Sequence, residues 1–362
     1  MERIYLDHNS GTFLDERVRS EYEKSLGEYW ANPSSVHHEG QKARSMLAHA
    51  RSRIAECFFV HHSQIVFFST ATEGLNTLIR GLLGDRILTS HVEHPAVWRA
   101  CQRAHPLYLA VDKRGYPAVS DVEAALQQGA TGMALMSVNN ETGVIAPYEE
   151  YAELAVKYHV PFVVDGVAHL GKIPFIFAEG ITAACFSSYK IHGPSGVAFA
   201  VINKKTRFNP LIIGGGQEFG LRSGTENVPA IIACARSVEL ILSEMQPSKI
   251  GALRDHFESR LMYELQGIER NGTGGRAPNT SNLAFANVRG EDLLIQLDRH
   301  GLAASHGSAC SAGAMEPSRI LLAMGYSHER VASSLRFSLS KFTTKEEIDQ
   351  AVDMIKKCLV SF

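Results

Sequence analysis

The segment AACFSSYKIHGPSG (183–196) joins a short apolar run to a turn rich in glycine and proline, with Lys190 at the junction. An apolar run of this length predicts a buried strand, and open α/β sheets place their chemistry at the carboxyl ends of such strands. Desolvation there would lower the pKa of the lysine amine, as a Schiff-base lysine requires. Taken alone the signal is weak, because most lysines at strand ends are solvated.

A second buried strand is predicted upstream, in PFVVDGVAH (161–169), and it ends in Asp165. A carboxylate in this place can pair with a protonated pyridine nitrogen, which is what makes pyridoxal phosphate (PLP) an electron sink. The ordinary alternative is a turn or helix-capping aspartate, which is common at strand ends.

A third segment, QIVFFSTATEGLN (64–76), predicts a strand, a small polar turn at 69–72 and the start of a helix. Hydroxyls and free backbone N–H groups would converge there, which suits a phosphate. The alternative is a capping box of Thr70 with Glu73. A lysine, an aspartate and a phosphate turn at three strand ends form a combination that neither alternative explains.

Further motifs follow in order along nearly the whole chain. They are YLDHNSGT (5–12), NPSSVH (32–37), TATEGLN (70–76), HVEHPAV (91–97), SVNNETG (137–143), VVDGVAHLGK (163–172), SSYKIHGPSG (187–196), GGGQEFGLRSGTENVP (214–229), GSACSAG (307–313) with EPS (316–318), and LRFSLSKFTTKEEID (335–349). With these motifs the sequence resembles the cysteine desulfurases of the NifS/IscS type, PLP enzymes of aminotransferase class V. The resemblance implies an α/β protein of PLP-dependent transferase fold type I, a PLP cofactor and a homodimer.

The apolar pattern predicts a large PLP-binding domain, 13–245, and a small α+β domain made of 1–12 and 246–362; the resemblance assigns the N-terminal dozen to the latter. Short apolar runs alternating with helical periodicity favour a mainly parallel sheet with helices on both faces. Strands are expected at 64–69, 86–90, 107–111, 132–138, 161–165, 183–188, 197–202, 281–288 and 333–340. Helices are expected at 228–245, 250–267, 291–300 and 344–360.

Composition limits the classes of function. The 362 residues carry 36 basic and 38 acidic side chains, which argues against nucleic acid as a partner. No signal peptide and no apolar stretch of the ~18 residues that a membrane helix needs are apparent, so we expect a cytoplasmic protein without membrane partners. The six cysteines lack CxxC spacing, so we expect reduced thiols and no metal site.

Cys310 is the candidate nucleophile. Its neighbours in LAASHGSACSAGAMEPS (302–318) are nearly all Ser, Gly and Ala, which indicates a mobile loop. The resemblance implies that this thiolate attacks the substrate sulfur and leaves carrying a persulfide. The alternative, a buried inert cysteine, suits Cys185 inside its apolar strand better.

The resemblance implies the other roles. His94 would stack on the pyridine ring and move protons, whereas His91 is expected to be structural. Asn140 would contact cofactor and substrate, Asn32 would line the substrate entrance, and Arg336 would grip the substrate carboxylate. An edge-strand surface residue is the alternative for this arginine. The cofactor-binding set so implied is Ala71, Thr72, His94, Asn140, Asp165, Ser187, Tyr189, Lys190 and, reaching the phosphate of the partner subunit, Thr225.

Several positions depart from the family pattern. The family's Ser-x-His-Lys has Tyr189 in place of histidine, and its Asp-x-x-Gln has Ala168 in place of the amide that hydrogen-bonds the cofactor's phenolic oxygen. His169 is a doubtful substitute, because neighbouring strand residues point to opposite faces. Phe219 replaces an arginine, and His-Asn-Ser-Gly (8–11) replaces Asn-Ala-Ala-Thr.

The function predicted is removal of sulfur from L-cysteine to give L-alanine and a persulfide on Cys310, for transfer to sulfur-acceptor or iron–sulfur scaffold proteins. Two alternatives stay open. One is a selenocysteine lyase or another class V lyase or aminotransferase. The other is a non-catalytic scaffold, which Ala168 and Tyr189 keep open.

Overall fold

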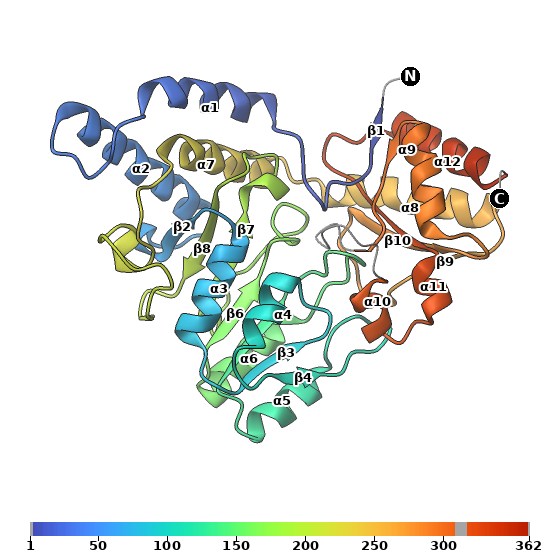
Figure 1. The fold of residues 1–362 in the computed structure, drawn as a ribbon, viewed down its shortest axis with the longest axis horizontal. Coiled ribbons are helices and arrows are strands. Elements are labelled where there is room, and N and C mark those ends of the chain that lie inside the picture. The colour runs from blue at the N-terminus through green and yellow to red at the C-terminus, as the bar shows by residue number, and fades with distance from the viewer. Residues whose placement is uncertain (1–2, 308–316, 361–362) are drawn as a thin grey trace.

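A seven-stranded sheet lies at the centre of the larger part of the molecule (Figure 1). The structure, a computed structural model, describes residues 3–307 and 317–360. The strand order is β2-β8-β7-β6-β5-β3-β4, and only β8 runs against the others. The strands are β2 (Ile65–Phe68), β3 (Ile87–Ser90), β4 (Leu107–Leu109), β5 (Gly132–Met136), β6 (Phe162–Asp165), β7 (Ala183–Ser187) and β8 (Ala198–Ile202). The predicted mainly parallel sheet is confirmed.

Helices cover both faces of this sheet, because successive side chains of each strand point to opposite sides. Phe67 packs in one apolar core, whereas its neighbours Val66 and Phe68 pack in another. The first core is closed by α2 (His38–Cys57), α5 (Val119–Gln127), α6 (Tyr148–Tyr158) and α7 (Val228–Ser243), and the second by α3 (Ala71–Leu82) and α4 (Pro95–Cys101).

A separate apolar core lies in the C-terminal part, on the right in Figure 1. There the antiparallel sheet β12-β10-β9 packs with three helices, and the pair β1-β11 joins the first residues of the chain to it. Ile4 and Leu6 are buried with Phe257 and Phe337. These elements are β1 (Ile4–Tyr5), α8 (Pro247–Glu264), β9 (Ile268–Arg270), β10 (Thr280–Phe285), α9 (Gly290–Arg299), β11 (Leu302–Ala303), α10 (Arg319–Ala323), α11 (His328–Ala332), β12 (Ser334–Ser338) and α12 (Lys345–Leu359). The two-part plan fits the separate cores, while the exact domain boundaries stay a prediction.

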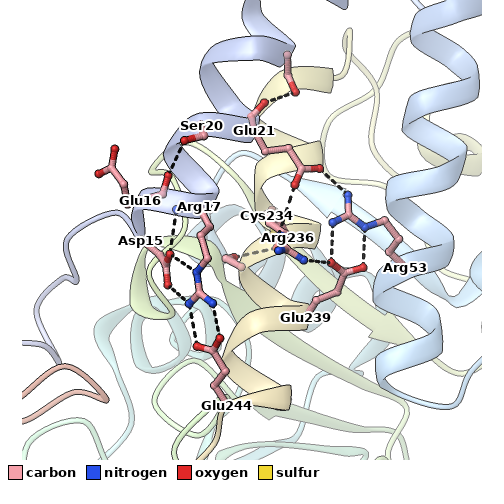
Figure 2. Close-up of polar contacts among 12 residues, drawn as sticks. Asp15, Glu16, Arg17, Ser20, Glu21, Arg53, Cys234, Arg236, Glu239 and Glu244 are labelled. Carbon is pink, nitrogen blue, oxygen red and sulfur yellow. Dashed lines mark hydrogen bonds and ion pairs between the residues drawn. The ribbon is translucent and has the colours of Figure 1, made fainter.

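Some elements differ from expectation. α8 covers 247–264 rather than 250–267, because Pro247 occupies the first turn, where its missing N–H costs nothing. α1 (Glu16–Glu28) and α2 were not predicted. They are tied to α7 by ion pairs, with Arg17 bridging Asp15 and Glu244 and Arg53 bridging Glu21 and Glu239 (Figure 2).

Within 3–307 and 317–360, no helix is both long and apolar enough to cross a membrane. The same residues contain no group of three or more His, Cys, Asp or Glu side chains able to hold a metal ion.

The contact between α3 and β7 leaves no room for a methyl group, and this is testable. A Cβ at Gly74 would lie 2.8 Å from Cys185 Sγ and 3.1 Å from Phe68 Cδ2. Gly74→Ala should therefore lower the free energy of unfolding by about 1–2 kcal/mol, although alanine favours helices. Gly27→Ala in α1 is the matched control, because nothing lies within 4 Å of its Cβ, and it should be neutral or stabilising. Urea unfolding of both variants gives the comparison, and equal shifts would contradict the expected crowding.

Candidate active site

A pocket opens where the strands β2, β3, β5, β6 and β7 end. Because these strands are parallel, their carboxyl ends share one edge of the sheet, and β12 of the C-terminal part closes the pocket with Arg336. The predicted residues that line it are Ala71, Thr72, His94, Asn140, Asp165, Ser187, Tyr189, Lys190 and Arg336. The pocket is also lined by His8, Asn9, Ser10, Ala168 and Lys172.

Lys190 stands directly after β7, at the end of the short helix η2 (Ser188–Lys190). Its ammonium donates to the backbone carbonyl oxygen of Ser10 at 2.8 Å and also to that of Asn9. Nζ lies 4.6 Å from the centre of the Tyr189 ring, so the phenol that replaces the family histidine contacts the amine through its π face. Lys190 thus lines the pocket at the carboxyl end of β7.

Asp165 ends β6 and is buried. Burial raises the pKa of its carboxyl group to about 6, although a hydrogen bond from the Val167 N–H (3.0 Å) and the positive charge of Lys190 both favour the ionised form. A buried carboxylate in this state is stabilised by a cation placed against it. The site thus suits a ligand that brings a positive group to the end of β6.

Glu93 is a second buried carboxyl group, and the sequence reading did not assign it a role. Its oxygens accept hydrogen bonds from Ser90 Oγ (2.6 Å) and from the Met136 N–H (2.7 Å). Burial, with a smaller effect of nearby Asp165, raises its pKa to about 8. Glu93 is therefore uncharged at neutral pH, which leaves the negative charge of this region on Asp165.

Lys172 is a buried lysine to which the sequence analysis gives no role, whereas Lys190 is only partly buried. Lys172 Nζ donates to the carbonyl oxygen of Lys190 at 3.2 Å, and burial followed by the charge of Lys190 lowers the pKa of Lys172 to about 8. The only available signal was its place in the motif VVDGVAHLGK. Ala168, which lacks the family amide, lines the same pocket. His169 does not line it: its ring nitrogens engage Ser137 Oγ and the Pro174 carbonyl.

His94 caps the first turn of α4, and its Nδ1 accepts a hydrogen bond from the Ala96 N–H at 3.1 Å. An accepting Nδ1 carries no proton, which fixes the tautomer. Burial, followed by the charges of Lys190 and Arg319, lowers its pKa to about 4. The imidazole is therefore neutral at physiological pH. It can contact an aromatic ligand, but it is a weaker base than an ordinary histidine.

Arg336 is buried, so the edge-strand surface alternative is wrong. Its Nη2 donates to Asp7 Oδ1 at 2.7 Å and to Ser10 Oγ at 2.6 Å, and Nη1 donates to the Asn140 carbonyl oxygen at 3.1 Å. Two buried atoms here lack a partner among the described residues, namely Arg336 Nε and Asn140 Oδ1. Such atoms are costly, and a donor and an acceptor in one pocket indicate a ligand that carries both complementary groups.

The turn after β2 starts α3 and borders the pocket. Thr70 caps α3 by accepting a hydrogen bond from the Glu73 N–H at 3.1 Å, so the capping alternative describes the helix start correctly. The reciprocal bond runs from the Ser69 N–H to the Glu73 carboxylate rather than from Thr70. Ala71 and Thr72, in the first turn of α3, nevertheless line the pocket, where the helix terminus favours an anion.

Two predicted site residues, Asn32 and Thr225, are not among the described residues that line the pocket. Asn32 is exposed in a turn, where its Oδ1 accepts from the Ser34 N–H at 2.9 Å. Thr225 is exposed just before α7. Cys310 lies outside the described residues. Cys185 is buried in β7, where burial raises the pKa of its thiol well above the ordinary value, as expected of a structural cysteine.

The family model of aminotransferase class V matches residues 4–351. The chain is 37% identical to a cysteine desulfurase of Trichormus azollae, over 98% of this chain and 92% of that protein. It is 36% identical to the cysteine desulfurase IscS of Dictyoglomus turgidum, over 98% of this chain and 94% of that protein. The chain belongs to the cysteine desulfurases of aminotransferase class V.

Solved structures place this family member in the same group. The X-ray structure of a NifS-like protein from Rickettsia africae aligns with a TM-score of 0.92 and 29% identity, covering 99% of this chain and all of that one. The resemblance and the fold type predicted from the motifs are therefore confirmed. Relative to the family pattern, the changes at 168 and 189 lie in the pocket lining, whereas Phe219 is exposed outside it.

The protonation of Glu93 predicts how stability depends on pH. Folding raises the pKa of Glu93 from 4.5 to about 8. The contribution of this group to the free energy of unfolding is therefore complete below about pH 4.5 and is lost as the pH rises toward 8. Glu93→Gln copies the neutral form, since its amide can accept from Met136 N–H and donate to Ser90 Oγ. Relative to the parent, the variant should gain roughly 4 kcal/mol in unfolding free energy between pH 4.5 and pH 8.

Urea unfolding of the cofactor-free protein across this pH range tests the prediction. Glu153→Gln, an exposed substitution in α6, is the control and should follow the parent at every pH. A constant difference between Glu93→Gln and the parent would mean that Glu93 is ionised in the folded protein.

Proposed function

We propose that the protein is a PLP-dependent cysteine desulfurase that converts L-cysteine to L-alanine and leaves the sulfur as a persulfide on Cys310 for acceptor proteins. One observation carries the proposal. The Lys190 amine, the Asp165 carboxyl and the Arg336 guanidinium, from three distant segments, line one pocket. The described cysteines are all free thiols.

The pocket fits PLP by the chemistry of its lining. Lys190 would bind the aldehyde carbon, Asp165 would face the ring nitrogen, and Thr72 and Ser187 with the α3 terminus would hold the phosphate. When bound, this cofactor withdraws electrons from the bonds around the substrate α carbon. Burial raises the pKa of Asp165, and a pyridinium beside the carboxylate would lower it again.

The two unpartnered atoms fit an amino acid substrate. Arg336 Nε can donate to its carboxylate, and Asn140 Oδ1 can accept from its amino group. The Lys190 amine would move protons at the substrate's α and β carbons. The neutral imidazole of His94 would lie against the pyridine ring of the cofactor. The Cys310 thiolate would attack the substrate sulfur: the S–S bond forms, the C–S bond breaks, and the β carbon takes a proton to become the methyl group of alanine.

Two substitutions separate the proposed roles. Cys310→Ala should lower sulfide release from L-cysteine by about a hundredfold or more while the visible absorption of bound PLP remains. Lys190→Ala should lose both. Cys57→Ala is the matched control: this half-buried thiol, whose pKa burial raises to about 11, should keep full activity. Mass spectrometry after reaction with cysteine should locate the extra sulfur at 310, and full activity of Cys310→Ala would disprove the persulfide role.

We also propose a homodimer in which Thr225 serves the partner's pocket, since it is exposed and does not line the pocket of its own chain. Subunit mixing tests this. If sites are composite, a dimer of one Lys190→Ala chain and one Thr225→Ala chain keeps one intact site, so mixtures should recover about a quarter of parental activity. Activity equal to the mean of the two separate variants would show that each site is built within one chain.

A further inference from the structure

The N-terminal turn, residues 7–11, contacts two cationic groups of the pocket, Lys190 and Arg336. Lys190 Nζ donates to its backbone, and Arg336 donates to the side chains of Asp7 and Ser10. The sequence here is also this chain's own, because Ser10 stands where the family pattern has alanine. A hydroxyl thus lies beside the arginine expected to bind the substrate carboxylate.

Ser10 completes a three-membered hydrogen-bonded ring with Asp7 and Arg336. Its Oγ accepts from Arg336 Nη2 at 2.6 Å and donates to Asp7 Oδ1 at 2.9 Å, and Asp7 Oδ1 accepts from the same Nη2 at 2.7 Å. The Ser10 hydroxyl therefore engages Nη2 of the guanidinium and also holds the Asp7 carboxylate against it. The Arg336 and Asp7 side chains are only 3% and 15% exposed, so water screens this ring little.

The ring uses the hydrogens that a substrate carboxylate would need. A guanidinium binds a carboxylate through two parallel N–H groups, and the side-on pair consists of Nε–H and one Nη2–H. Both Nη2 hydrogens are engaged by Asp7 and Ser10. Among the described residues, Nε has no acceptor. Of the side-on pair, the Nε–H is therefore available to a ligand, whereas Nη2 already donates to two acceptors.

The turn is held in place by Asn9, which also replaces a family alanine. Asn9 Nδ2 donates to Thr280 Oγ1 at 2.9 Å and to the Asn140 carbonyl oxygen at 3.2 Å, and Asn9 Oδ1 accepts from Asn279 Nδ2 at 2.9 Å. These bonds fix the backbone that carries Ser10. The hydroxyl is thus preorganised against the guanidinium, and ligand binding must displace it.

We propose that Ser10 sets the affinity of the pocket for an amino acid carboxylate by competing for Arg336. The inference rests on the proposed function in so far as the ligand is an α-amino acid. Ser10 is a positioning residue, and it acts through Arg336. Replacing Ser10 with alanine removes one acceptor of Arg336 Nη2 and also removes the hydroxyl that donates to Asp7. The freed Nη2–H and the Nε–H can then both bind the carboxylate of the ligand.

The test uses binding without turnover. L-Alanine, which keeps the amine and the carboxylate but has no sulfur, is titrated into the PLP-loaded protein by calorimetry, and ethylamine serves as the ligand without a carboxylate. In Ser10→Ala the Kd of L-alanine should fall roughly three- to tenfold, the value of one hydrogen bond, while that of ethylamine stays the same. Ser10→Thr keeps the hydroxyl and should match the parent.

Kinetics provide the second readout. In Ser10→Ala the KM for L-cysteine should fall by a similar factor, with kcat changed less than about twofold. An unchanged or weaker affinity for L-alanine in a folded Ser10→Ala protein would overturn the inference, as would an equal gain for ethylamine. If the parent binds L-alanine but releases no sulfide from cysteine, the proposed function fails while the competition at Arg336 is still measured.

Discussion

The parallel alignment of five strands is the constraint on which the site depends. Because β2, β3, β5, β6 and β7 all end at one edge, short segments more than a hundred residues apart in sequence meet there. Each strand end contributes a different group: hydroxyls and helix N–H groups after β2, an imidazole after β3, the Asn140 amide after β5, a carboxylate from β6 and an amine after β7. The C-terminal part then adds the guanidinium from β12.

Several of these groups are buried at a cost in free energy that the surroundings offset in different ways. Glu93 avoids the cost by keeping its proton, as its raised pKa shows. Arg336 offsets it with hydrogen bonds to Asp7, Ser10 and the Asn140 carbonyl. The Asp165 carboxylate accepts a single hydrogen bond among the described residues, from the Val167 N–H, so a cationic ligand would stabilise it further.

The sequence predicted the strands of the main sheet well, because each is a short apolar run bounded by polar turns. Strand-end placement also allowed Lys190, Asp165 and the turn before α3 to be identified as one site. Other features depend on contacts that no local pattern carries. The proton on Glu93 follows from complete burial, and two partners of Arg336, Asp7 and Ser10, lie more than 300 residues away in the chain. The start of α8 at Pro247 was missed because proline was read as a boundary rather than a first turn.

The contact of Lys190 with the N-terminal turn has a consequence for engineering. Its amine is received by main-chain oxygens of Asn9 and Ser10, which every amino acid at those positions would also present. Replacement of the Ser10 side chain therefore leaves this attraction in place, whereas loss of the Asn9 side chain, which anchors the turn, or a proline, an insertion or a deletion nearby would move the oxygens themselves. To change the surroundings of the Lys190 amine from this side of the pocket, the length or the backbone path of the 7–11 turn must be altered.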